Sequence, residues 1–166
     1  DMASTLKVDT IAHTGGTSAL TVDSGGRVKM PNQVIFQGVS ETIASGRYTT
    51  YTADAPSDGY TLSLTNIGGL LNVGGHFNAT TGTFTVPISG IYEFHVGFSS
   101  KNNNTNRKIG VVLVNNASIG EAFESSDPYA DGNRSFFANL SANDTVQLGT
   151  DGEAFAVCSF SGRLIQ

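Results

Sequence analysis

The segment from Asp127 to Asn133 holds the densest set of side chains able to bind a ligand. It reads Asp-Pro-Tyr-Ala-Asp-Gly-Asn, so two carboxylates, an amide and a phenol surround one glycine. Carboxylate and amide oxygens are the ligands that Ca²⁺ takes, and an aromatic ring among polar groups is typical of a sugar or protein contact. The spacing lacks the EF-hand pattern. We therefore predict an exposed loop in which Asp127, Tyr129, Asp131 and Asn133 contact a binding partner.

A second acidic pair, Asp151 and Glu153, flanks Gly152 near the carboxyl end of the chain. Its spacing is less typical of a metal site, but an assembly with threefold symmetry would bring three copies of the pair together. We expect these two residues to contribute to binding, and they are the candidate metal ligands. Calcium is the only cofactor that the sequence suggests.

Motifs of the common enzyme classes are missing from the sequence. It contains no G-x-S-x-G, no phosphate-binding P-loop, no H-E-x-x-H and no G-x-G-x-x-G. The three histidines, His13, His76 and His95, lie in separate segments and show no metal-ligand spacing. A glycan hydrolase would need two carboxylates across a cleft, whereas the acidic residues here fall mostly in separate turns. We predict that the protein is not an enzyme.

The charge of the chain argues against two classes of partner. The formal net charge is −5 and the isoelectric point is about 4.9. Binding to nucleic acid depends on clustered Lys and Arg, and these are missing here. No apolar stretch is long enough to cross a bilayer. We expect neither a nucleic-acid partner nor membrane insertion.

The elements that position these side chains read as β-strands. No window shows the spacing of an amphipathic helix, whereas short runs rich in Val, Ile, Thr, Phe and Tyr recur between Gly, Asn, Asp and Pro clusters. This pattern favours an all-β sandwich, jelly roll or barrel. The predicted strands are Val34–Gly38, Tyr60–Ile67, Thr83–Val86, Ile91–Ser99, Lys108–Val114, Ser135–Leu140, Thr145–Leu148 and Ala154–Leu164.

Two of these strands carry apolar residues in informative positions. Tyr92, Phe94, Val96 and Phe98 alternate along one face, which must belong to the core. Glu93 and His95 share the opposite face, which must be solvated or packed against another subunit. In the last strand Phe155 and Val157 point away from the face of Ala156, Cys158 and Phe160, which suggests burial on both sides through oligomerisation. Cys158 itself is expected to be a small buried apolar residue.

The first 33 residues differ from the rest. Leu20 to Met30 reads as two short strands around an Asp-Ser-Gly-Gly turn. A lone hairpin is marginal in water, so this segment should become ordered by pairing between chains. We interpret residues 1–33 as the end of a fibre stem and residues 34–166 as a separate head, with Pro31 at the junction.

Several stretches resemble a known family. They are Asn66-Ile67-Gly68, Gly75-His76-Phe77-Asn78, the run from Thr81 to Phe94 that reads TGTFTVPISGIYEF, and the ending Ser159-Phe160-Ser161-Gly162-Arg163-Leu164-Ile165. Together with Val34-Ile35-Phe36 and the run from Leu140 to Val146, they resemble the globular heads of complement component C1q, which are related to the tumour necrosis factor jelly roll. The match covers roughly residues 36–165.

The resemblance implies an antiparallel jelly-roll sandwich of ten strands in two sheets, which forms a tight homotrimer and acts as a recognition module. Glu93, His95, Phe155 and Val157 then become candidates for the trimer interface. The sequence departs from the family at Asn143, where the family often has Gly, and at Arg163, where an aromatic or aliphatic residue usually follows the final Gly.

The amino-terminal part resembles the stems that precede such heads in bacteriophage tail fibres. The function that this implies is a non-catalytic head of a virion appendage, which trimerises and attaches to a host cell surface. Its expected partners are a glycan or protein receptor on the host and, through the amino terminus, other fibre proteins. The alternative is a secreted, extracellular lectin-like protein of the complement-head family. Counting strands places loops Lys101–Asn106 and Ser141–Asp144 near the stem, and Ser118–Asn133 and Thr150–Glu153 at the apex.

Overall fold

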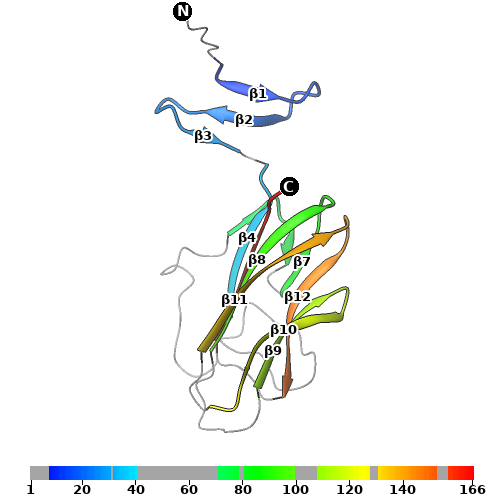
Figure 1. Ribbon diagram of the computed structural model, residues 1–166. Helices are drawn as coiled ribbons and strands as arrows, with labels where there is room; N and C mark the ends of the chain where they lie inside the picture. Colours follow the sequence, from blue (N-terminus) through cyan, green and yellow to red (C-terminus); the bar gives the residue numbers. More distant parts are fainter. Residues whose placement is uncertain are drawn as a thin grey trace, which may run out of the picture. The chain divides into compact units, whose positions relative to one another are not determined.

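The computed structural model describes residues 8–30, 32–40, 71–78, 81–99, 108–127, 131–152 and 157–166 (Figure 1). The chain divides into two compact units, residues 1–33 and residues 34–166. The strand expected at Tyr60–Ile67 lies outside the described residues. The described residues contain no helix able to cross a membrane.

The described part of the first unit, residues 8–30 and 32–33, contains an antiparallel sheet of three strands. It consists of β1 (Thr10–Ala12), β2 (Ser18–Val22) and β3 (Val28–Lys29), in that order. The turn predicted around Asp23 joins β2 to β3. The strand β1 was not predicted, because three residues are too few to show an alternating pattern.

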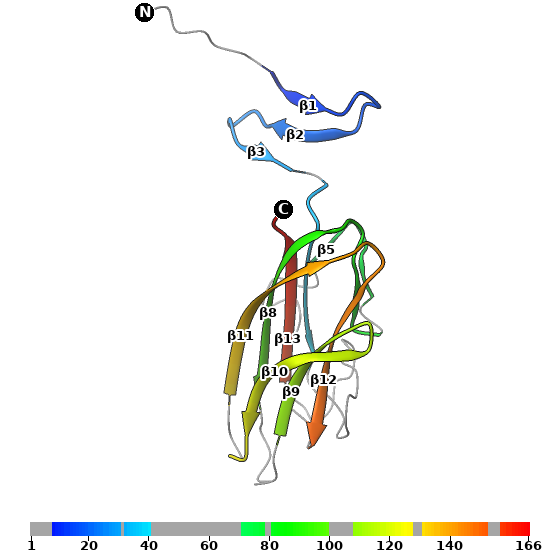
Figure 2. The same ribbon diagram turned by 45° about the vertical axis from the view of Figure 1, so that its right-hand side comes forward.

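In the described residues the second unit forms two antiparallel sheets, each with five strands (Figures 1 and 2). One, here called the β8 sheet, has the order β11-β8-β13-β4-β5, and the other, called the β9 sheet, has the order β10-β9-β12-β7-β6. The strands of the β8 sheet are β11 (Asp131–Leu140), β8 (Gly90–Ser99), β13 (Val157–Leu164), β4 (Ile35–Ser40) and β5 (Leu71–Val73). Those of the β9 sheet are β10 (Ala117–Ser125), β9 (Lys108–Val114), β12 (Thr145–Gly152), β7 (Thr83–Thr85) and β6 (Phe77–Asn78). The prediction of an all-β fold with two sheets is confirmed.

Aromatic rings fill the core between the two sheets. The predicted core face of β8 is confirmed, because Tyr92 and Phe94 are fully buried and Val96 and Phe98 are each 2% exposed. Phe36 from β4 stacks on Phe84 from β7, with ring centroids 4.5 Å apart, and so links the two sheets. This close packing of rings leaves no room for side chains at Gly162, where a Cβ would lie 2.6 Å from Phe94 and 2.7 Å from Phe36.

Cys158 lies in this core, as predicted. The residue is 1% exposed, and burial raises the pKa of its thiol well above the usual value. A thiol without an accessible thiolate is unreactive, so Cys158 serves as a small apolar residue of the folded protein.

The strand β9 is buried on both of its faces. Val112 packs into the main core, whereas Ile109, Val111 and Leu113 form a second buried cluster on the other face of the strand. The sequence Ile-Gly-Val-Val-Leu-Val fits this environment, because a strand that is covered on both sides reads as a continuous apolar run.

The strand registers define two ends of the second unit. Val34 and Gln166 lie at one end, called the Val34 end, where Ile91 donates to the carbonyl of Gln166. Ser99 lies at the other, called the Ser99 end, because its partners Asp131 and Val157 begin their strands there. Lys108, paired with Ser125 and Gly152, belongs to that end as well.

These registers correct the predicted position of one loop, the connection after Ser99. The strand β10, which occupies Ala117–Ser125, was expected to be part of a loop. The prediction counted strands back from Gln166 without β10, so every connection before β10 was expected at the wrong end. The connection between Ser99 and Lys108 was therefore expected near the stem, whereas it begins and ends at the Ser99 end. The turn at residues 141–144 lies at the Val34 end, as expected, since its amide at Asn143 donates to the carbonyl of Val86 near the start of β8.

Candidate functional site

The outer face of the β8 sheet, which points away from the core, carries an uncovered mixture of apolar and polar side chains. In one row across the strands, Ile35, Arg163, Glu93 and Phe137 are neighbours in register. The next row contains Gln37, Ser161, His95 and Ser135. Exposed apolar side chains occur in both edge strands, at Leu71 (39% exposed) and Phe137 (67%), and in the inner strand β8 at Ile91 (38%). We call this surface the outer face below.

An ion pair lies in the middle of the outer face. The Arg163 Nε and Nη2 atoms each lie 2.7 Å from Oε2 of Glu93. On the other side, Oε1 of Glu93 lies 3.6 Å from Nε2 of His95, and Nδ1 of that ring is 2.6 Å from the Ser135 hydroxyl. The Glu93 side chain is only 14% exposed, whereas that of Arg163 is 51% exposed. Arg163, one of the two positions that depart from the pattern of the resembled family, thus neutralises the carboxylate of Glu93.

A groove follows the edge where β10 and β11 approach each other. Phe137 and Ile119 line it and are 67% and 52% exposed. Arg134 crosses the groove and donates from Nη1 to the carbonyl of Glu121, 2.6 Å away. The groove and the outer face share Phe137, so a partner could contact both. Sequence reasoning missed Phe137, although the adjacent pair Phe136-Phe137 on an alternating strand requires one ring to face away from the core.

Two of the predicted binding residues meet at the Ser99 end. Asp131 and Asn133 were expected in a loop but lie in β11. Both are exposed and line a shallow hollow of about 270 Å³ together with Ser99 and Ser159. The hollow has room because Gly97 carries no side chain: a Cβ there would lie 2.6 Å from the Ser159 hydroxyl.

The remaining predicted site residues are described only in part. Asp127 is exposed, and its amide donates to the Ser125 hydroxyl. Tyr129, Glu153 and Phe155 lie outside the described residues. For Asp151 and Val157 the strand backbone is described but the side chains are not. Across the described part of the chain, no group of three His, Cys, Asp or Glu side chains could hold a metal ion.

The turn at residues 141–144 explains the other departure from the family pattern. Asn143 has a φ of +74°, a left-handed conformation that Gly adopts freely and Asn tolerates better than most residues. Asp144 closes this turn, because its carboxylate accepts hydrogen bonds from the Asn115 side chain and the Ser141 amide, each at 2.8 Å. The Asn115 bond is the larger cause of a lowered pKa for the Asp144 carboxyl. This site is therefore structural.

Comparison with known proteins identifies the family. The family model of the C1q domain matches residues 50–165, and the chain belongs to this family. The globular domain of zebrafish complement 1qA superposes with a TM-score of 0.54 at 19% identity, over 80% of this chain and 98% of that one. Murine APRIL superposes with a TM-score of 0.53 at 8% identity, over 80% of this chain and 99% of that one. At these identities the similarity shows the fold, a C1q and tumour-necrosis-factor-like jelly roll. A search of curated protein sequences found no significant match.

Proposed function

We propose that this protein is the non-catalytic, homotrimeric head of a viral fibre, and that it attaches the fibre to a host cell surface. The observation that supports this most is the outer face of the β8 sheet, which leaves Phe137, Ile91 and Leu71 uncovered in a single chain. C1q and tumour-necrosis-factor-like domains are generally non-enzymatic, often trimeric, and mediate recognition.

The chemistry of the outer face suits a contact between copies of the chain. Interface cores are poor in unpaired charge and rich in aromatic residues. The central carboxylate of Glu93 is already paired with Arg163, so covering it would not strand a lone charge. Phe137 at the margin and the groove beside it supply an aromatic anchor and a place for a neighbour's side chains.

Recognition is assigned to the Ser99 end. A trimer would present three copies of Asp131 and Asn133, together with three copies of the connections that begin and end at the Ser99 end. Simultaneous binding at three sites raises the overall affinity even when each single contact is weak. Asp127, Tyr129, Asp151 and Glu153 remain proposed members of this surface, with Asp151 and Glu153 as the proposed calcium ligands.

The first unit supports the fibre setting, because residues 8–30 form a small sheet of the kind that a stem would need. In this proposal residues 1–33 link the head to other virion proteins. A secreted, lectin-like recognition protein is the second candidate, and the C1q family match favours it, since one of the similar structures is a complement domain.

The proposed assembly predicts the mass of the protein in solution. Light scattering at micromolar concentration should give about 52 kDa, three times the 17.3 kDa chain. Residues 34–166 alone should also form a trimer, because the outer face lies entirely within them, although with a lower melting temperature. A well-folded monomer of the full chain would refute the trimer.

The proposed recognition surface predicts which substitutions abolish attachment. With fluorescent trimers and a panel of intact bacterial cells, Asp131→Ala combined with Asn133→Ala should reduce binding to the positive strain at least about tenfold, because avidity multiplies the loss at each of three sites. The matched control is Asn143→Gly at the Val34 end, where the φ of +74° suits glycine. If both variants bound cells of the positive strain equally well, with unchanged melting temperatures, Asp131 and Asn133 would not belong to the recognition surface.

A further inference from the structure

The sheet of the first unit is amphipathic. Val22 pairs with Val28, and Ile11 pairs with Leu20, which lies two residues before Val22, so all four side chains share one side of the sheet. Met30 follows Val28 by two residues and continues this side. We call this set the stem face: Ile11, Leu20, Val22, Val28 and Met30. On the other side the pairs are Thr10 with Thr21 and Thr21 with Lys29.

The stem face is open to solvent within a single chain. Val28 is 64% exposed, Met30 52% and Ile11 51%. A sheet that buries one face is stable only when a second layer covers that face. Within the described residues of one chain this face has no such cover, so these side chains call for a partner that supplies it.

The two turns of the sheet repeat one geometry ten residues apart. In the first, the His13 amide donates to the Thr17 carbonyl and the Gly16 amide donates to the His13 carbonyl. In the second, the Asp23 amide donates to the Arg27 carbonyl and the Gly26 amide donates to the Asp23 carbonyl. Gly16 and Gly26 have φ values of +84° and +77°, so only glycine fits well. The two turns therefore share one hairpin geometry, although the register between β1 and β2 shifts once, between Ile11 and Ala12.

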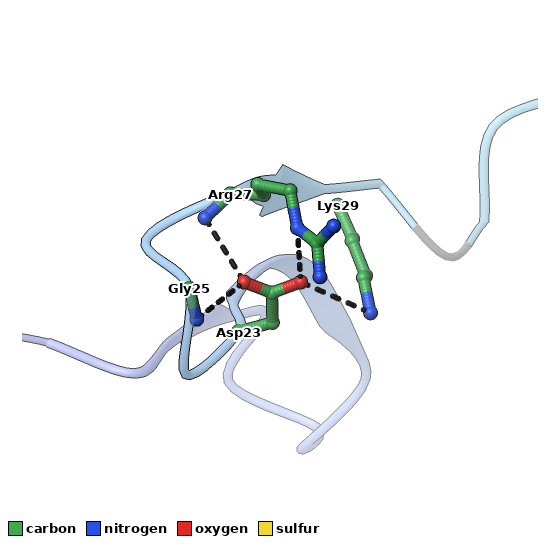
Figure 3. A network of polar contacts seen from close by, with 4 residues as sticks. All are labelled: Asp23, Gly25, Arg27 and Lys29. Atoms are coloured by element: carbon green, nitrogen blue, oxygen red, sulfur yellow. Dashed lines mark hydrogen bonds and ion pairs between the residues drawn. The ribbon is translucent and has the colours of Figure 1, made fainter.

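Charged groups at the second turn are engaged with each other on the polar side (Figure 3). Asp23 accepts bonds from the amides of Gly25 and Arg27, lies 2.9 Å from the Arg27 guanidinium and 3.4 Å from the Lys29 ammonium. The amide of Arg27 is the largest cause of the lowered pKa of Asp23. Because the folded pKa is lowered, this stabilisation is present above pH 3.8 and is lost as the pH falls through the lower, folded value.

The short connection between the two units favours one partner for the stem face, a second copy of the same segment. Five residues separate Lys29, the end of β3, from Ile35, the start of β4, and an extended connection of this length spans at most about 20 Å. If the heads form the trimer proposed above, three stem faces are tethered close together, at an effective concentration of about a millimolar or more. A second and third copy of the same segment are therefore the partners most available to each stem face.

We propose that the stem faces of three chains pack against one another, so that Ile11, Leu20, Val22, Val28 and Met30 form a shared apolar core while Thr10, Thr21 and Lys29 face solvent. Contact is then made by sheet faces, whereas strand pairing between chains was the expectation from the sequence. This inference rests on the homotrimer proposed above.

Two adjacent positions provide a matched test in the full chain. In a single chain Val28 is 64% exposed and the Lys29 side chain 62% exposed, but the two point to opposite sides of the sheet. The variants Val28→Cys and Lys29→Cys each add one thiol, and the native Cys158 is buried. Each maleimide labelling rate in the native protein is divided by the rate of the same variant in urea. This normalised rate should be at least about tenfold lower for Val28→Cys than for Lys29→Cys, because reaction at position 28 requires opening of the covered face.

Parallel measurements separate this inference from the trimer itself. Adding Phe137→Lys, which is expected to dissociate the heads, should remove the difference in labelling between the two positions. Equal labelling of both positions in a protein that light scattering shows to be trimeric would overturn the stem-face packing and leave the trimer intact. Slow labelling of position 28 in a monomeric protein would overturn both the trimer and the stem-face packing. Residues of the same chain would then be what covers the stem face.

Discussion

Replacing Phe36 with alanine is expected to lower the free energy of unfolding of the head by about 3–5 kcal/mol. Phe36 is 1% exposed and stacks on Phe84 and Phe77 of the β9 sheet, with centroids 4.5 and 4.8 Å away. It also meets Phe160 of its own sheet edge-on at 4.8 Å. The substitution would remove a ring that joins both sheets and leave a cavity that the surrounding rings cannot fill.

Urea unfolding, followed by circular dichroism, measures this loss, and several chain concentrations are needed because association adds to apparent stability. The matched control is Phe123→Ala, since Phe123 is only partly buried and packs against the margin of the same core. Its cost should be clearly smaller. Similar losses for the two variants would show that the ring stack around Phe36 is not the centre of stability.

Replacing Phe137 with lysine is expected to dissociate the trimer while leaving each chain folded. Phe137 is 67% exposed, so the core does not depend on it, and its cross-strand partner Glu93 can accept a nearby cation. At an interface, loss of an aromatic anchor costs about 2–4 kcal/mol, which weakens each contact roughly 30-fold to 1,000-fold. The desolvation of the new ammonium group adds to this cost.

Sedimentation velocity over a range of concentrations tests the prediction. The control is Thr85→Lys, an exposed strand position on the β9 sheet, whose neighbour Phe84 points into the core. The control should remain trimeric. A Phe137→Lys protein with the mass of three chains at low concentration would place the interface elsewhere, and dissociation of both variants would point to a general effect of added charge.

The class of fold and the core face of β8 could be predicted from local patterns in the sequence. Alternation of side chains along a strand is a local property, so the pattern from Ile91 to Ser99 was sufficient to separate the buried rings from Glu93 and His95. The same holds for the burial of Cys158 and for the turn after Val22, where Gly26 has a φ of +77°, a conformation closed to most residues. These predictions agree with the structure.

Only the tertiary structure revealed β10. Ala117 to Ser125 reads Ala-Ser-Ile-Gly-Glu-Ala-Phe-Glu-Ser, which lacks the apolar alternation of an inner strand. Among the described strands it lies at the edge of its sheet and pairs with β9 only, so little of it must be buried. The expected loop positions were counted back from the last strand, and each antiparallel strand in that count reverses the chain direction. Because β10 was missing from the count, the connection after Ser99 was expected at the wrong end of the head.

The site likewise depended on contacts between distant segments. Glu93 and Arg163 are 70 residues apart and meet because β8 and β13 are neighbours in the sheet. Asp131 and Asn133 reach the hollow with Ser159 through the order β11-β8-β13. The stem face arises in the same way, since the pairing of Val22 with Val28 and of Ile11 with Leu20 places all four on one side. Strand order and register depend on the packing of the whole domain, so no local pattern could predict these neighbours.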